Sequence, residues 1–96
     1  MPSFEEHCRE SKVLFGNPFH EVHIWLDAFA GQQEYGMKHR RVRHHLHGIN
    51  QAVELFGLEA EAPARRHIIS DLRQEGWTDK DPFPKDEADY VRIGLF

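Results

Sequence analysis

The sequence predicts an all-α fold, a compact antiparallel bundle of four main helices with a turn-rich C-terminal tail. Glycine and proline divide the chain at intervals that suit helices, and no run alternates apolar and polar residues for long enough to indicate a sheet. The connections between the helices are short, which favours antiparallel neighbours. A chain of 96 residues buries one modest core, so we expect residues 1–96 to form a single helical domain.

Capping signals predict the first two helices. A serine followed three residues later by a glutamate has the pattern of a capping box and begins a first helix at residues 3–15, which a glycine can end. Asn17 before Pro18 is a suitable N-cap and first-turn pair for a second helix. We expect this second helix to end near Ala30, where another glycine follows.

The second half of the chain predicts two longer helices and a tail. The third and longest helix covers about residues 34–56, and the fourth covers about residues 63–75; a glycine follows each. The remaining "WTDKDPFPKDEADYVRIGLF" is rich in turn residues, and Pro84 or Asp86 could begin a last short helix there. That helix would return three apolar side chains to the core: Tyr90, Val91 and Ile93.

Composition limits the class of function. The formal net charge is −4 with histidine neutral, which argues against a nucleic-acid binder held by counterion release. The single Cys8 excludes an intramolecular disulfide and a multi-cysteine zinc site, and it fits a reducing compartment. No apolar run approaches the roughly 18 residues of a membrane span, and no signal-peptide pattern is present. We therefore expect a cytoplasmic protein.

The eight histidines of the chain are the main indication of chemistry. In "HEVHIWLD", helical geometry places His20, His23 and Asp27 on one ridge beside the apolar stripe of the second helix. In "HIISDL", His67 and Asp71 are one turn apart on the fourth helix, the same spacing as His23 and Asp27. The sequence thus contains two imidazole–carboxylate pairs that lie next to predicted core faces.

The dense string "KHRRVRHHLHGI" divides among different faces of the third helix. His39 borders the buried stripe on the side where Arg43 follows, and His45 borders it on the other side. His44 and His47 should point outward toward solvent. Histidines that are adjacent in this string therefore cannot all meet one ion.

These patterns lead to a hypothesis of metal binding. A bundle can bring helix-borne ligands together, and imidazole with carboxylate suits a divalent transition metal such as zinc, iron or nickel. The predicted ligands are His23, Asp27, His39, His67 and Asp71, with His20, His44 and His45 as secondary candidates. Either aspartate could instead accept the free ring N–H of a ligating histidine. A coordination position left open to water could generate hydroxide for hydrolysis.

Other functions remain open from the sequence. Arg40 and Arg43 lie on the His39 side and could bind a small anionic ligand, so a hydrolase of a phosphorylated substrate is one form of the hypothesis, with catalytic residues unknown. The alternative is a non-enzymatic interaction module that forms a homo-oligomer through a helix face. In that case the histidines and aspartates only satisfy interhelical hydrogen bonds.

The order of several strings resembles a family of small bacterial and phage-associated proteins of unknown function. The strings are HxWxD at residues 23–27, HRxxxHHxxGI at residues 39–49, "FG" at residues 56–57 and HxxxDL at residues 67–72. The resemblance covers most of the chain from residue 19 onward and implies no activity. It implies a set of polar positions: His23, Asp27, His39, Arg40, His44, His45, His67 and Asp71.

A weaker likeness is to the HD-domain metal-dependent phosphohydrolases. In these enzymes an arginine and a histidine on one helix precede a His-Asp pair on a later helix, and residues 41–72 have that order. Ser70 stands where the histidine of the pair is expected, and His67 lies one turn earlier. The likeness implies metal-dependent hydrolysis of a phosphate ester, with His67 in a different geometry.

Overall fold

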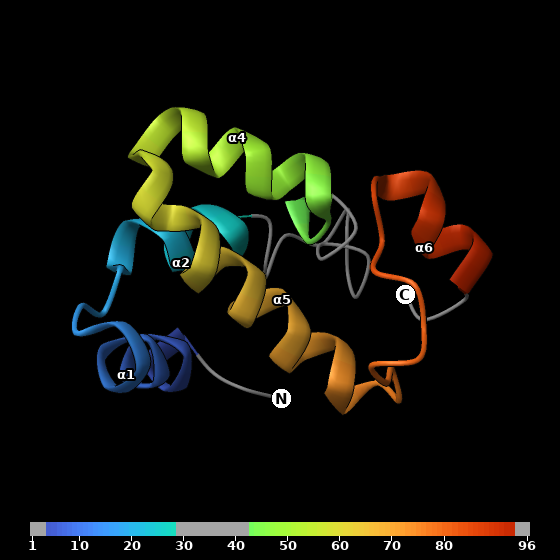
Figure 1. Cartoon of the computed structure of the whole chain (residues 1–96), viewed down its shortest axis with the longest axis horizontal. Coiled ribbons are helices and arrows are strands. Elements are labelled where there is room, and N and C mark those ends of the chain that lie inside the picture. The colour runs from blue at the N-terminus through green and yellow to red at the C-terminus, as the bar shows by residue number, and fades with distance from the viewer. Residues whose placement is uncertain (1–3, 29–42, 94–96) are drawn as a thin grey trace.

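The computed structural model describes residues 4–28 and 43–93, and these form an all-α fold (Figure 1). The elements are α1 (Phe4–Phe15), α2 (His20–Leu26), α4 (Leu46–Phe56), the 3-10 helix η2 (Leu58–Ala60), α5 (Glu61–Gln74) and α6 (Glu87–Ile93). The described ranges contain no strand, which confirms the predicted class. None of the described helices has both the length and the apolar character needed to cross a membrane.

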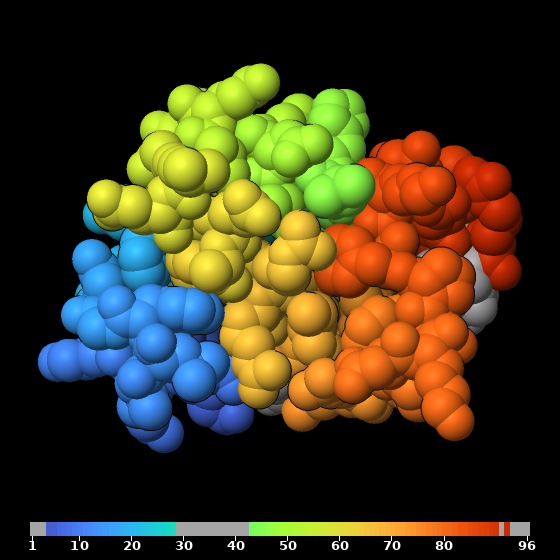
Figure 2. Space-filling view, in the orientation of Figure 1, coloured from blue at the N-terminus to red at the C-terminus, as the bar shows by residue number. Residues whose placement is uncertain are grey.

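Helix α5 is the centre of the fold and contacts α1, α2 and α4 (Figure 1). The largest fully buried apolar side chains come from α5 and from the elements around it: Leu26, Ile49, Ile68, Leu72 and Tyr90. Figure 2 shows α1 and the residues that follow α5 on opposite sides of the exposed face of α5. Each helix therefore buries one face against α5 or its neighbours, as expected for amphipathic helices.

The second helix is shorter at both ends than the sequence predicts. Asn17 does not cap it; its side chain accepts a hydrogen bond from the backbone N–H of Phe19 at 2.9 Å. Phe19 has a left-handed backbone (φ 52°), a conformation that costs about 1–2 kcal/mol and that its packing against the core offsets. Helix α2 begins after Phe19 and ends at Leu26, so that Asp27 lies just outside it.

The prediction of a continuous third helix is wrong at His44 and His45, where the chain forms a bend. The part of that prediction over residues 34–42 lies outside the described residues. His45 has an extended backbone, and its Nδ1 accepts the N–H of Gly48 at 2.9 Å, which caps α4. A Cβ atom at Gly48 would lie 1.9 Å from the backbone oxygen of Arg43. The glycine in "HLHGI" therefore lets the chain fold back over the first turn of α4.

The C-terminal segment is anchored to the bundle and ends in the predicted short helix. Trp77 is buried, and its indole N–H donates to the backbone oxygen of Pro82 at 3.1 Å. Asp86 caps α6 by accepting the N–H of Asp89 at 3.1 Å, as one of the two predicted helix starts requires. Tyr90 on this helix is fully buried in the core.

Candidate metal centre

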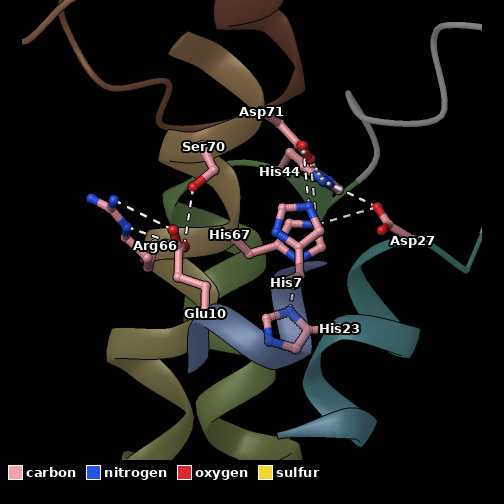
Figure 3. Close-up of polar contacts among 9 residues, drawn as sticks. All are labelled: His7, Glu10, His23, Asp27, His44, Arg66, His67, Ser70 and Asp71. Carbon is pink, nitrogen blue, oxygen red and sulfur yellow. Dashed lines mark hydrogen bonds and ion pairs between the residues drawn. The ribbon is translucent and has the colours of Figure 1, made fainter. Parts of the chain in front are cut away.

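Two imidazole rings and two carboxylates meet between α2, α4 and α5 (Figure 3). Asp27 follows α2, His44 lies in the bend before α4, and α5 supplies His67 and Asp71. The exposed fraction is 1% for His44, 1% for His67 and 2% for Asp71. The side chain of Asp27 is 25% exposed, so it forms the solvent side of an otherwise buried group.

The nitrogen and oxygen atoms of this group lie close to one another. His44 Nε2 lies 3.3 Å from Asp27 Oδ1 and 3.0 Å from Asp71 Oδ2. His67 Nε2 lies 3.3 Å from Asp27 Oδ1 and 3.4 Å from Asp71 Oδ2. Each residue offers one ligand atom, and all of these atoms lie within 4.8 Å of one another. The group could therefore hold a metal ion.

The second nitrogen of His67 leads to a chain of buried polar groups. His67 Nδ1 lies 2.7 Å from His23 Nδ1, and His23 Nε2 lies 2.7 Å from the hydroxyl of Ser11 on α1. His23 and Ser11 are 1% and 2% exposed. This chain fixes the orientation of the His67 ring from the side opposite to the carboxylates.

His7 on α1 supports the same group. Its ring stacks on the His67 ring with the centroids 3.6 Å apart, and its Nε2 lies 3.2 Å from Asp71 Oδ1. The other oxygen of Asp71 thus remains directed toward His44 and His67. His7, His23 and His67 form a second buried group whose ligand atoms lie within 4.8 Å of one another.

The charges in the group stabilise one another. Burial alone would raise the pKa of Asp27 and of Asp71, but the hydrogen bonds with His44 and His67 lower both pKa values well below the usual range. Burial alone would lower the pKa of His44, yet the contacts with Asp27 and Asp71 raise it. His44 Nδ1 is buried and has no hydrogen-bond partner among the described residues, so Nε2 is the ring nitrogen that bonds to them.

The environment of His23 differs, because its ring nitrogens contact His67 and Ser11 and, among the described residues, no carboxylate. Burial, followed by the nearby His67, lowers the pKa of His23 to about 3. His23 is therefore neutral in the folded protein. Its ring can accept one hydrogen bond and donate another.

We expect metal-free protein to lose stability as the pH falls from about 6 to about 4, by up to about 1.4 kcal/mol of unfolding free energy per pH unit. In the unfolded chain His23 becomes protonated below about pH 6.5, whereas in the folded protein it becomes protonated only near pH 3. In this window the other shifted groups contribute little. Asp27 and Asp71 have lowered pKa values, so their contribution to stability is lost only below about pH 4. His44 has a raised pKa, so its contribution to stability is lost only above about pH 6.5.

Urea unfolding of chelator-treated protein across this pH range measures the slope. His23→Gln should flatten it, and His20→Gln, at an exposed position of the same helix, should leave it unchanged. An equal slope in the His23 variant would contradict the assignment.

The structure divides the residues predicted as main ligands between two groups: Asp27, His67 and Asp71 lie with His44, whereas His23 lies with His7 and His67. His39, the fifth, and Arg40 lie outside the described residues. Two secondary candidates lie elsewhere, since His20 is exposed beside the Phe4 ring and His45 caps α4. Arg43 lies over the Trp25 ring and donates to the Trp25 backbone oxygen at 2.8 Å, away from this group.

Sequence reasoning missed His7 and misjudged His44. The prediction that His44 points outward is wrong, because the bend before α4 turns its ring inward, whereas His47 is exposed as expected. His7 gave one local signal, its i, i+4 spacing from Ser11 on α1. Nothing local could show that this face of α1 packs on α5.

Ser70, which stands where an HD-domain protein would have the histidine of its His-Asp pair, does not point toward the metal-ligand group. The Ser70 hydroxyl donates to Glu10 at 3.2 Å, and Arg66 also donates to Glu10 at 3.1 Å (Figure 3). Ser70 therefore contributes to the contact between α1 and α5, and His67 provides the imidazole.

Comparison with known proteins gives one match. Residues 2–81 match a family described as "Domain of unknown function (DUF6915)". No curated protein and no solved structure matches the chain.

Proposed function

The chain belongs to this family of unknown function, and we propose from its own geometry that it is a domain binding one divalent transition metal. The ligands are Asp27, His44, His67 and Asp71. The ion joins the end of α2, the bend before α4 and the middle of α5.

The observation that carries the proposal is the set of distances among the ligand atoms. A tetrahedral zinc site with bonds of about 2.0–2.1 Å separates neighbouring ligand atoms by about 3.3–3.4 Å. The four nitrogen–oxygen distances in the group are 3.3, 3.0, 3.3 and 3.4 Å. Two neutral imidazoles and two carboxylates also balance the charge of a divalent cation.

The surrounding hydrogen bonds support coordination through His67 Nε2. When Nε2 binds a metal, the ring hydrogen is on Nδ1 and is donated to His23 Nδ1. His23 then carries its own hydrogen on Nε2 and donates it to the Ser11 hydroxyl. Histidine ligands in proteins usually donate their other N–H in this way, so His23 and Ser11 act as supporting residues.

A shell of four protein ligands favours a binding or structural role over hydrolysis. Structural zinc sites have four protein ligands, whereas catalytic sites have three and leave one position for water. All four members of this group are directed at one another, and three of them are almost fully buried. We therefore propose that the ion stabilises the arrangement of the helices, with zinc as the best fit to the donor set.

The test is metal content followed by cobalt substitution. Untagged protein purified without added metal should contain close to one equivalent of zinc, iron or nickel. Cobalt(II) added to chelator-treated protein should give the intense visible bands of a tetrahedral ion, with no sulfur-to-metal charge transfer because no thiolate is a ligand.

Two results would overturn the proposal. One is protein that contains no metal and takes up no cobalt. The other is the weak visible spectrum of an octahedral, largely hydrated cobalt ion. The first result would favour the alternative in which the buried histidines and aspartates form only a network of hydrogen bonds and ion pairs.

A further inference from the structure

Resting on the proposed metal site, we further infer that the C-terminal segment 84–90 positions His44 for the ion. Metal binding and docking of this segment are then two parts of one equilibrium. Tyr90 is the central residue, and it acts on the ligand through the backbone of His44.

Three hydrogen bonds tie the segment to the chain around His44. The Tyr90 hydroxyl donates to the backbone oxygen of His44 itself. The N–H of Leu46 donates to the oxygen of Pro84 at 2.9 Å, and the N–H of His47 donates to the oxygen of Lys85 at 3.0 Å. The segment therefore contacts the ligand residue and the first turn of α4.

These contacts replace those that a continuous helix would supply. The first N–H groups of any helix lack acceptors within it, and those of α4 at Leu46 and His47 find theirs in the C-terminal segment. His44 lies in the bend, outside α4. Its side-chain direction consequently depends on what holds the bend, and Tyr90 holds the His44 carbonyl.

The segment is held in place by buried and packed side chains. Tyr90 and Pro84 are fully buried. The Phe83 ring packs edge-on against Trp77 with centroids 6.4 Å apart, and the Arg65 guanidinium lies 5.4 Å from the Phe83 centroid. The backbone that accepts from α4 is thus packed against α5. Residues 84–90 follow residue 81, where the family match ends.

Coupling follows from geometry and linkage. A metal binds His44 well only when the ring is at the correct distance, so loss of the Tyr90 contact lets the bend move and weakens binding. By reciprocity, a bound metal that holds His44 must strengthen docking of the segment by the same factor. The N–H groups of Leu46 and His47 report docking directly, because their acceptors belong to the segment.

The experiment compares Tyr90→Phe with Thr78→Val in the full chain, with zinc as the probe. Tyr90→Phe removes one hydroxyl and keeps the ring, and zinc affinity measured against a chromophoric chelator should fall about tenfold. Thr78→Val removes a hydroxyl that, within the described residues, bonds to Asp81 and Lys80 and not to the ligands, so its Kd should stay within about twofold of wild type. Zinc should slow hydrogen exchange at Leu46 and His47 in wild type, and less in Tyr90→Phe.

The outcomes separate the two proposals. If wild type binds no zinc, the proposed function fails and this inference fails with it. If wild type binds zinc but Tyr90→Phe has an unchanged Kd and only a lower Tm, Tyr90 is merely structural and this inference alone is overturned. Should Tyr90→Phe fail to fold, wild-type exchange decides: zinc that leaves Leu46 and His47 exchange unchanged overturns the coupling.

Discussion

Replacing His44 with alanine is expected to abolish specific zinc binding, raising the Kd by more than about a hundredfold. His44 Nε2 contacts both carboxylates of the centre, and its removal leaves three ligands and an uncovered position. Residues that only support a ligand already change metal affinity by about 10–100-fold, so loss of a ligand should exceed that range. Competition titration of metal-free protein with a chromophoric chelator measures the effect.

His47→Ala is the matched control for His44→Ala. Both histidines belong to the same string, but His47 is exposed whereas His44 is 1% exposed. The control should bind zinc as wild type does, and circular dichroism should show that both variants keep the helix content of wild type. Equal losses in the two variants would mean that zinc binds the histidine-rich surface and not the buried centre.

His23→Gln distinguishes the two buried groups of potential ligands. With the ion between Asp27, His44, His67 and Asp71, His23 only orients His67, so His23→Gln should weaken zinc binding by about 10–100-fold and retain the site. With the ion between His7, His23 and His67, the ranking would reverse, and His44→Ala would become the milder change. The order of the two Kd values therefore locates the ion.

Zinc at a hundred times its Kd is expected to raise the unfolding free energy of the metal-free protein by about 2.7 kcal/mol, because the ion binds the folded state only. For a domain of this length that corresponds to a rise in Tm of about 10–20 °C. The ligands come from the residue after α2, the bend before α4, and α5, so the ion links segments that the unfolded chain leaves apart. Differential scanning calorimetry with and without zinc measures the shift.

Chelator should reverse this stabilisation, and His44→Ala should not show it. A Tm that zinc does not move in wild type would contradict the prediction. So would an equal rise in His44→Ala, since that would come from ions on surface histidines. Metal-free protein should remain folded at neutral pH, because the ion pairs of His44 with Asp27 and Asp71 persist without the ion.

Local geometry accounts for the part of the site that the sequence predicted. His67 and Asp71 share one turn of α5, and His23 and Asp27 keep the same spacing across the end of α2. Within one helix the direction of each side chain follows from its position, so the contact of His67 with Asp71 could be predicted without a structure. Capping residues and glycines likewise indicated α1, α5 and α6.

Only the tertiary structure decided which histidines complete the centre. Helical periodicity placed His44 outward, but Gly48 permits a bend and the C-terminal segment accepts the N–H groups that a continuous helix would have used. His7 is brought onto His67 by the packing of α1 against α5, across 60 residues of chain. The sequence by itself determined α1, α5 and α6 and the His67–Asp71 pair, because short-range geometry sets them. The inward turn of His44 and the stacking of His7 depend on contacts between distant segments, which no local pattern contains.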